Sequence, residues 1–279
     1  MSEFRNVDDI VIVKVGTNVL TNTFEDGHQE LDSESFRRIG RSILALESIG
    51  VRVVLVTSAG ITAGMAEVGL NKRPDKTTES GLLELQRLSS IGWRALLNEW
   101  HDALSGRVSG SLQLTTNELD LATPREEALG TIQTLLRHDE TPIVNENDAI
   151  TRTEITFGDN DILAATLASR MVGSSTLSSA NIRVVLLSDV HGVYEDKDDP
   201  STRIHTINDY QDYLHLANDI NGGSGNSKGG MTSKFNAAKI VTGSGMSMYI
   251  AHGRTENILQ DVLSRENRTT GTEFLPKAA

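Results

Sequence analysis

Residues 10–15 read Ile-Val-Ile-Val-Lys-Val and run directly into Gly16-Thr17-Asn18. Five β-branched residues in six positions are typical of a short strand that is covered on both faces. Such a strand belongs to a largely parallel sheet with helices over each face. Because ligands gather at the carboxyl ends of these strands, the stretch predicts an α/β protein with Lys14 near a possible site.

Similar apolar runs recur along the chain, and longer amphipathic segments separate them. The predicted strands are residues 10–15, 51–57, 107–114, 142–145, 182–188 and 246–251. Apolar residues three or four positions apart predict helices at residues 35–49, 82–104, 124–136, 160–171 and 231–241. This alternation, with no internal repeat and no polar linker, predicts one domain over residues 1–279 with a mainly parallel sheet.

The composition excludes several classes of function. The 279 residues include 26 Lys and Arg against 38 Asp and Glu, so a surface that binds nucleic acid is not expected. The absence of cysteine excludes disulfides, thiol nucleophiles and thiolate metal sites. No signal peptide is visible, and no apolar run approaches the ~20 residues that span a bilayer. The sequence predicts a soluble cytoplasmic protein with neither nucleic acid nor membrane as a partner.

Polar residues follow the second and fourth predicted strands. Thr57-Ser58-Ala59-Gly60 precedes a helix, and its free amides could receive an anion or simply form a tight turn. Asn145-Glu146-Asn147-Asp148 follows the fourth strand, and Gly158-Asp159-Asn160-Asp161 opens the next helix. Asp159 or Asn160 could be a helix N-cap, which would leave the first acidic cluster unexplained. The pattern suits recognition of an ammonium and a carboxylate together, or the ordering of lysines and a divalent cation.

A glycine-rich segment at residues 221–234 opens the last predicted helix. Unpaired amides at a helix N-terminus attract phosphate, and Lys234 in the first turn could reach its outer oxygens. The segment does not match the Walker A pattern, and a flexible surface loop is the plain alternative. His191 and His252 have no partner at a spacing that suits a triad or a metal site, so both are interpreted as loop or structural residues.

Taken in order, these blocks resemble the glutamate 5-kinase family of the amino-acid kinase superfamily. The resemblance extends from Ile12 to Phe274. The blocks that carry it are Val13-Lys14-Val15-Gly16-Thr17, Val56-Thr57-Ser58, Ile143-Val144-Asn145-Glu146-Asn147-Asp148, Gly158-Asp159-Asn160-Asp161, Leu187-Ser188-Asp189-Val190-His191-Gly192-Val193-Tyr194 and Gly229-Gly230-Met231-Thr232-Ser233-Lys234. The resemblance implies a three-layer α/β/α sandwich around a mainly parallel sheet. It also implies a kinase domain alone, without the C-terminal PUA domain of many relatives.

The activity that the resemblance implies is transfer of a phosphoryl group from ATP to the γ-carboxylate of L-glutamate, in proline biosynthesis. A carboxylate with a pKa of about 4.3 is ionised at pH 7, so no general base is needed. The site must instead align the reactants and neutralise charge. Mg²⁺ would arrive with the nucleotide, without a metal site on the protein. The resemblance further implies a homo-oligomer and functional coupling to glutamate-5-semialdehyde dehydrogenase.

The resemblance also implies roles for individual residues. Lys14 and Lys234 would hold the phosphates and stabilise the transition state, while Asp161 would orient both ammonium groups. Asp148 would be the partner of the substrate ammonium. The glutamate-binding positions correspond to Ser58, Asp148 and Asn160. The nucleotide-binding positions correspond to Lys14, Ser188, Asp189, Lys228, Gly229, Gly230, Met231, Thr232, Ser233 and Lys234.

Some residues depart from the family pattern. Ser58-Ala59-Gly60 stands where the family has Ser-Gly-Ala, and Ile91-Gly92-Trp93 where it has Val-Gly-Gln. Leu129-Gly130-Thr131-Ile132 corresponds to Arg-Asn-Thr-Leu, and Lys228 adds a cation that either reaches the phosphates or is solvated. These departures leave strict glutamate specificity and proline feedback open.

Two alternatives compete with this function. One is a kinase of the same fold for another small acid, such as an N-acetylated amino acid or a carbamate-like substrate. The other is a non-catalytic amino-acid sensor. Retention of Asp148 argues for a free ammonium on the substrate, and the preserved lysine pair argues against a sensor.

Overall fold

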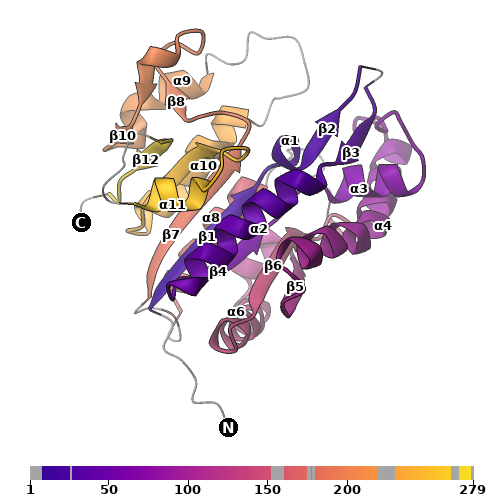
Figure 1. Cartoon of the computed structure of the whole chain (residues 1–279), viewed down its shortest axis with the longest axis horizontal. Helices are drawn as coiled ribbons and strands as arrows, with labels where there is room; N and C mark the ends of the chain where they lie inside the picture. The colour runs from indigo at the N-terminus through magenta and orange to yellow at the C-terminus, as the bar shows by residue number, and fades with distance from the viewer. Residues whose placement is uncertain are drawn as a thin grey trace.

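An eight-stranded sheet forms the centre of the computed structural model, in the order β10-β12-β11-β7-β1-β4-β6-β5 (Figure 1). The structure describes residues 8–25, 27–151, 160–174, 177, 180–218, 230–264 and 270–277. The strands of the sheet are β1 (Asp9–Val15), β4 (Arg52–Val56), β5 (Ser109–Leu114), β6 (Thr141–Glu146), β7 (Asn181–Ser188), β10 (Thr206–Ile207), β11 (Met248–His252) and β12 (Thr272–Phe274). Neighbouring strands are parallel except β11 and β12.

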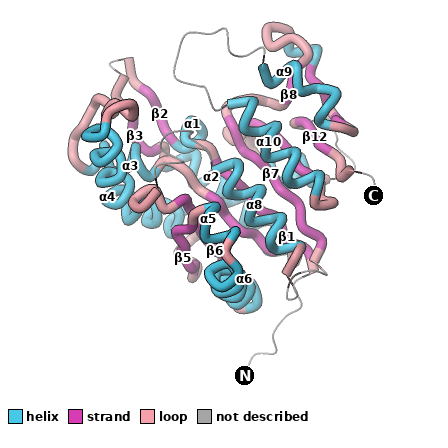
Figure 2. Tube along the Cα trace, turned by 180° about the vertical axis from the view of Figure 1, so that it is seen from behind, coloured by secondary structure: helices cyan, strands magenta, loops and turns pink. Residues whose placement is uncertain are grey.

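Helices cover both faces of this sheet and complete three layers (Figure 2). The helices are α1 (Thr17–Leu20), α2 (Ser33–Ser48), α3 (Gly60–Glu67), α4 (Glu79–Ala103), α5 (Thr116–Asp120), α6 (Ala122–Arg137), α8 (Asn160–Val172), α9 (Leu214–Asn218), α10 (Gly230–Gly243) and α11 (Ile258–Leu263). Side chains alternate along β1, so Val11 and Val13 join the core under α2, α4 and α11. Ile10 and Ile12 join the core under α6, α8 and α10. The α/β/α fold class predicted from the sequence is confirmed.

All six predicted strands and all five predicted helices are present, with ends that differ by a few residues. One expectation is wrong: the apolar runs predicted strands that are covered on both faces, but most residues of β5 are partly exposed. This strand lies at the edge of the sheet. The short hairpins of β2 (Thr21–Thr23) with β3 (Gln29–Leu31) and of β8 (Val193–Tyr194) with β9 (Arg203–Ile204) were not predicted. Among the described residues, no helix combines the length and apolar character that crossing a bilayer requires.

Helices α3 and α4 touch backbone to backbone. A Cβ atom at Gly64 would lie 1.9 Å from the carbonyl oxygen of Leu88, and one at Gly92 would lie 2.0 Å from that of Gly60. Only glycine permits such a close approach at these two positions. The contact fixes the start of α3 against α4, directly after the polar residues that follow β4.

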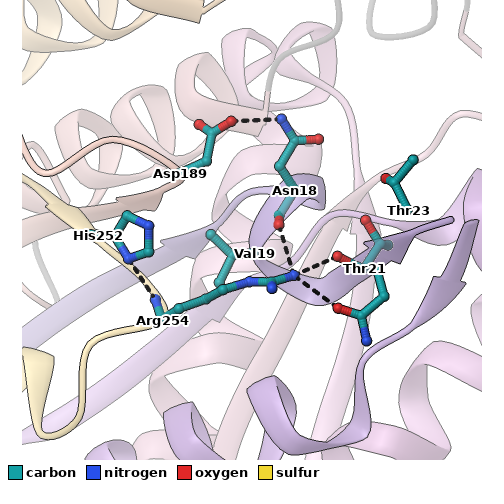
Figure 3. A pocket seen from close by; sticks show the side chains of 8 residues that line it. Asn18, Val19, Thr21, Thr23, Asp189, His252 and Arg254 are labelled. Atoms are coloured by element: carbon teal, nitrogen blue, oxygen red, sulfur yellow. Dashed lines mark hydrogen bonds between the residues drawn. The ribbon is translucent and has the colours of Figure 1, made fainter. Parts of the chain in front are cut away.

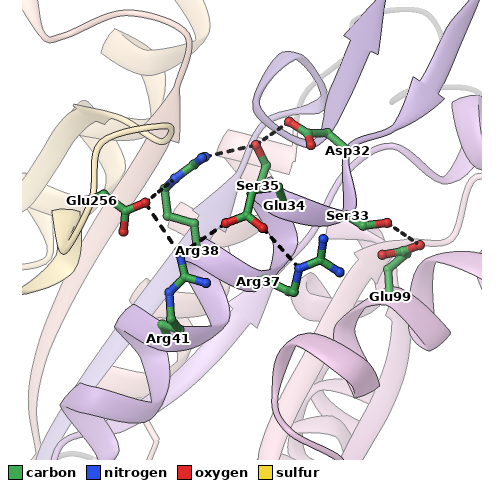
Figure 4. A network of polar contacts seen from close by, with 9 residues as sticks. All are labelled: Asp32, Ser33, Glu34, Ser35, Arg37, Arg38, Arg41, Glu99 and Glu256. Carbon is green, nitrogen blue, oxygen red and sulfur yellow. Dashed lines mark hydrogen bonds and ion pairs between the residues drawn. The ribbon is translucent and has the colours of Figure 1, made fainter.

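A polar network surrounds the N-terminus of α2 (Figure 4). Ser33 Oγ donates to Glu99 of α4 at 3.1 Å, and Arg38 Nε donates to Glu256 before α11 at 2.9 Å. The network therefore connects α2 to α4 and to the segment that leads into α11. Since Glu256 is 61% exposed, its ion pair contributes at most about 1 kcal/mol to stability.

Candidate active site

The predicted site residues meet at one edge of the sheet. Lys14 is the penultimate residue of β1, Ser58 and Asp148 follow β4 and β6 by two residues, and Asp189 directly follows β7. Helices α8 and α10 begin at the same edge, where Asp161 and Lys234 lie in their first two turns. This is the edge at which parallel strands present their carboxyl ends, where open α/β sheets bind ligands.

Lys14, Asp161 and Lys234 form a buried cluster. Lys14 Nζ lies 2.5 Å from Asp161 Oδ1, and Lys234 Nζ lies 3.1 Å from Asp161 Oδ2. The three residues are 7%, 2% and 8% exposed in chain order. Lys234 Nζ also donates to the carbonyl oxygen of Gly230 at 3.3 Å. One carboxylate thus faces two ammonium groups, and the surplus positive charge suits an anionic ligand such as a phosphate.

The two lysines keep Asp161 ionised. Burial opposes ionisation of this carboxyl, but the charges and hydrogen bonds of Lys14 and Lys234 outweigh it and lower its pKa below the ordinary value. Asp161 therefore carries its charge throughout the neutral pH range and holds both ammonium groups in place.

Asn160 connects the segment that follows β4 to the last residues of β6. Its Nδ2 donates to the carbonyl oxygen of Thr57 (2.8 Å), to Ser58 Oγ (3.1 Å) and to Asn145 Oδ1 (3.0 Å). Its Oδ1 accepts from the backbone N–H of Glu146 at 3.2 Å. The carboxamide therefore holds Ser58 against the start of α8, and a direct contact between Asn160 and glutamate stays a prediction.

Asp148 is a buried carboxylate with an unused acceptor. It is 6% exposed, and its Oδ2 accepts from Ser89 Oγ at 3.0 Å. Its Oδ1 has no hydrogen-bond partner in the described part of the chain. Burial raises the pKa of Asp148 to about 6, against the hydrogen bond from Ser89 and the charge of Arg73. At pH 7 this side chain is mostly ionised and can accept from an ammonium group.

Glu146 lies two residues before Asp148, at the end of β6, and is 3% exposed. Burial, together with the charges of Asp148 and Glu118, raises the pKa of Glu146 to about 8. This carboxyl is therefore mostly protonated at pH 7. Asp148 then carries most of the negative charge of the pair.

A pocket of about 500 Å³ lies beside Asp189, which is one of the residues that line it (Figure 3). Its lining residues are Asn18, Val19, Thr21, Asn22, Thr23, Asp189, His252 and Arg254. Asn18 Nδ2 donates to Asp189 Oδ2 at 2.8 Å, and Ser188 Oγ donates to its Oδ1 at 3.0 Å. Burial raises the pKa of Asp189, but these hydrogen bonds and the charge of Lys234 together outweigh burial. The pKa of Asp189 is therefore lower than its ordinary value. Lys14, Asp161 and Lys234 are not among the residues that line this pocket.

Sequence reasoning missed Asn18 and Arg254 as pocket residues. The Arg254 guanidinium donates to the carbonyl oxygens of Thr21 (2.6 Å) and Asn18 (3.3 Å), which fastens the segment after β11 to the segment after β1. Both residues follow the carboxyl end of a strand, and that position was the available signal. His191 and His252, interpreted from the sequence as structural, stack with ring centroids 4.2 Å apart.

The predicted nucleotide-binding segment is described only in part. Lys228 and Gly229 lie outside the described residues, as do residues 152–159. Gly230, Met231, Thr232 and Ser233 form the first turn of α10, where Thr232 Oγ1 donates to the carbonyl oxygen of Ala217 at 3.0 Å. Within the described ranges, no group of three or more His, Asp or Glu side chains is arranged to hold a metal ion.

Ala59 has a left-handed backbone, with a φ of 77°, immediately before α3. This conformation is unfavourable for any residue with a Cβ atom. Ala59→Gly is expected to raise the free energy of unfolding by about 0.5–1 kcal/mol, measured by denaturant titration. Ala63→Gly, inside α3, is the control and should lower it by about 1 kcal/mol. A destabilised Ala59→Gly protein would show that no strain is relieved there.

The chain resembles known proteins in both sequence and structure. Residues 9–252 match the model of the amino acid kinase family. Glutamate 5-kinase from Clostridium acetobutylicum is 33% identical over 279 residues, which cover 98% of this chain and 96% of the relative. Glutamate 5-kinase from Streptococcus suis is 35% identical over 270 residues, which cover 95% of this chain and 70% of the relative.

Two solved structures share the fold at lower identity. Carbamate kinase from Giardia lamblia bound to AMP-PNP has a TM-score of 0.62 at 18% identity, covering 97% of this chain and 99% of that chain. N-acetylglutamate synthase from Neisseria gonorrhoeae has a TM-score of 0.61 at 16% identity, covering 97% and 62%. The two structures show the fold, and the sequence matches show that this chain belongs to the amino acid kinase family and, within it, to the glutamate 5-kinases.

Proposed function

We propose that this chain transfers the γ-phosphoryl group of ATP to the side-chain carboxylate of L-glutamate, which yields L-glutamyl 5-phosphate for proline biosynthesis. The observation that carries the proposal is the buried Lys14–Asp161–Lys234 cluster, with two ammonium groups for one carboxylate. The name of the 33–35% identical relatives supports the same substrates. An unpaired, buried Asp148 oxygen fits an amino-acid ammonium.

In the proposed reaction, a γ-carboxylate oxygen of glutamate attacks the γ-phosphorus of ATP. A new oxygen–phosphorus bond forms, the bond to the β-phosphate oxygen breaks, and its electron pair leaves with ADP. The carboxylate has no proton to lose at neutral pH, so no side chain acts as a base. Lys14 and Lys234 stabilise the negative charge on the phosphoryl oxygens, and Asp161 keeps the two ammonium groups at fixed positions.

The remaining predicted residues bind the two substrates. Ser58, Asn160 and Asp148 form the glutamate side of the site, and Ser188, Asp189 and the first turn of α10 form the nucleotide side. Mg²⁺ enters as part of the nucleotide substrate, where it neutralises phosphate charge. The two lysines supply the protein's own share of this neutralisation.

A substrate panel tests the proposal. ADP formation is measured with L-glutamate, N-acetyl-L-glutamate and carbamate as acceptors, each with ATP and Mg²⁺. L-Glutamate should be the best acceptor, because N-acetylation removes the ammonium that Asp148 would bind. Faster turnover of either other acid would favour the alternative kinase, and saturable glutamate binding without turnover of any acid would favour a sensor.

Asp148→Asn is expected to raise the KM for glutamate with a smaller effect on the KM for ATP. The substitution removes the charge that pairs with the substrate ammonium, and an unpaired buried charge costs several kcal/mol. In the wild type, this KM should also rise as the pH falls through about 6, where Asp148 becomes protonated. Asp148→Asn should lose that dependence.

Glutarate, which lacks the ammonium, provides the control for Asp148. The wild type should phosphorylate it poorly, and Asp148→Asn should affect it less than it affects glutamate. Equal turnover of glutarate and glutamate by the wild type would remove the role given to Asp148.

Two wider predictions accompany the proposed function. The chain is expected to form a homo-oligomer, which sedimentation velocity measures directly. It is also expected to couple functionally to glutamate-5-semialdehyde dehydrogenase, because an acyl phosphate hydrolyses readily in water. Faster reduction of the product in a mixture of the two enzymes than in sequential incubations would support that coupling.

A further inference from the structure

A buried hydrogen bond joins Ser89 of α4 to Asp148, 59 residues further along the chain. Ser89 Oγ donates to Asp148 Oδ2 at 3.0 Å, and the two residues are 1% and 6% exposed. In the described part of the chain, the Ser89 hydroxyl makes no other hydrogen bond, and Asp148 Oδ1 has no partner. The bond therefore decides which oxygen of the carboxylate is free to accept from a ligand.

The packing of α4 against α3 fixes the position of Ser89. The backbone of α4 rests directly on α3 beside Ser89, because a Cβ atom at Gly64 would lie 1.9 Å from the carbonyl oxygen of Leu88. A Cβ atom at Gly60, the first residue of α3, would lie 3.4 Å from Ser89 Oγ. Such close packing leaves the hydroxyl little freedom to move.

The turn that carries Asp148 is held by the same helix. Gln86 lies three residues before Ser89, on the same face of α4. Its Nε2 donates to the carbonyl oxygens of Ala149 and Thr151 at 3.4 Å. Two side chains of one helix therefore hold both the backbone of this turn and the carboxylate that projects from it.

We propose that Ser89 is a positioning residue, which fixes the Asp148 carboxylate so that Oδ1 accepts from the ammonium of the amino-acid substrate. This inference rests on the proposed function and adds a residue of α4 to the glutamate side of the site. A free carboxylate rotates about the bond to its Cβ atom, and binding would have to stop that rotation. Because Ser89 already holds Oδ2, less conformational freedom is lost when the ammonium binds.

The same hydrogen bond favours the charged form of Asp148. A hydroxyl donor stabilises a carboxylate more than a carboxylic acid, so the Ser89 bond lowers the pKa of Asp148 against the effect of burial. The charge of Arg73 acts in the same direction, and Glu146 is mostly protonated at pH 7. Loss of the Ser89 hydroxyl should therefore raise the pKa of Asp148 above its value of about 6.

The first test compares Ser89→Ala with Ser90→Ala. Ser90 is the next residue of α4, but it is exposed and its Oγ donates to the carbonyl oxygen of Arg87 in the same helix at 2.7 Å. At pH 6, Ser89→Ala should raise the KM for L-glutamate about 5- to 10-fold, because a hydrogen bond to a charged group is lost. The KM for ATP and kcat should change little. Ser90→Ala should match the wild type.

The pH dependence of this KM distinguishes positioning from a merely structural role. As the pH falls, the KM for L-glutamate should begin to rise at a higher pH in Ser89→Ala than in the wild type. The ratio of the two KM values should therefore be largest at and below about pH 6 and smallest above about pH 8. Arg73 and Glu146 are the same in both proteins, so their effects cancel in this ratio. An equal ratio at every pH would overturn the assignment.

A double substitution tests whether Ser89 acts through Asp148. Adding Ser89→Ala to Asp148→Asn should raise the KM for L-glutamate by less than about 2-fold, since the charge that Ser89 positions is already absent. Glutarate has no ammonium, so its KM should differ little between Ser89→Ala and the wild type. A full further increase in the double variant, or an equal increase for glutarate, would show that Ser89 does not act through Asp148.

The wild type separates this inference from the proposed function. If it forms acyl phosphate from L-glutamate and Ser89→Ala has the same KM at pH 6, the role of Ser89 fails and the proposed function stands. If the wild type forms no acyl phosphate, the proposed function fails. Isothermal titration with L-glutamate then decides the role of Ser89 without turnover. Weaker binding by Ser89→Ala, most marked at pH 6, supports it, and equal affinities at pH 6 and pH 8 overturn it.

Discussion

Lys234→Ala is expected to lower kcat about 10²- to 10³-fold, because it removes an ammonium group from the developing charge of the phosphoryl group. The KM for glutamate should change little, since the role proposed for Lys234 is to stabilise the phosphoryl group and not to bind glutamate. Lys14→Ala should behave in the same way. Steady-state kinetics with varied ATP and varied glutamate separate the two effects.

Lys239→Ala is the control for Lys234. Lys239 lies on the same helix, α10, but its side chain is exposed. Its substitution should leave kcat unchanged, which separates the loss of a buried charge from a general effect on the helix. Near-normal turnover of Lys234→Ala or Lys14→Ala would remove that lysine from the mechanism.

Asp161→Asn is expected to abolish most activity and to lower the free energy of unfolding by about 3–5 kcal/mol, because it leaves two buried ammonium groups without a counter-charge. Folding lowers the pKa of the Asp161 carboxyl, so its ionisation stabilises the folded protein. This contribution to the free energy of unfolding is fully present above the unfolded-state pKa of about 3.9. It declines as the pH falls towards the folded-state pKa. Denaturant titration at pH 7 should therefore show the whole decrease in the free energy of unfolding of Asp161→Asn relative to the wild type.

Asp120→Asn is the control for Asp161. Asp120 also pairs with a cation, Arg170, but it is 60% exposed, so its loss should cost less than about 1 kcal/mol. If Asp161→Asn were as stable as Asp120→Asn, the two lysines would not depend on Asp161 for their charge balance.

Much of the fold could be predicted because its main elements carry strong local patterns. The five β-branched residues of 10–15 indicate a strand covered on both faces, and Val11 and Val13 do pack on the opposite side from Ile10 and Ile12. The two hairpins and the terminal strand β12 were missed because two or three residues are too short to show a period. Tertiary pairing, and not local preference, makes these segments extended.

The location of the site could also be predicted, but its contacts could not. Lys14, Asp161 and Lys234 are far apart in the chain, and only the order of the strands brings β1, α8 and α10 together. The family resemblance supplied their roles without their geometry. The multiple hydrogen bonds of Asn160 and the unpaired Oδ1 of Asp148 depend on side-chain positions, for which a single sequence carries no pattern.

Trapping the product tests phosphoryl transfer to glutamate directly. The wild-type protein is incubated with ATP, Mg²⁺ and L-glutamate in the presence of hydroxylamine, which converts an acyl phosphate into a stable hydroxamate. We expect γ-glutamyl hydroxamate in amounts that match the ADP released, with almost none from Lys234→Ala. ADP release from the wild type without hydroxamate, or hydroxamate at equal rates from Lys234→Ala, would contradict this expectation.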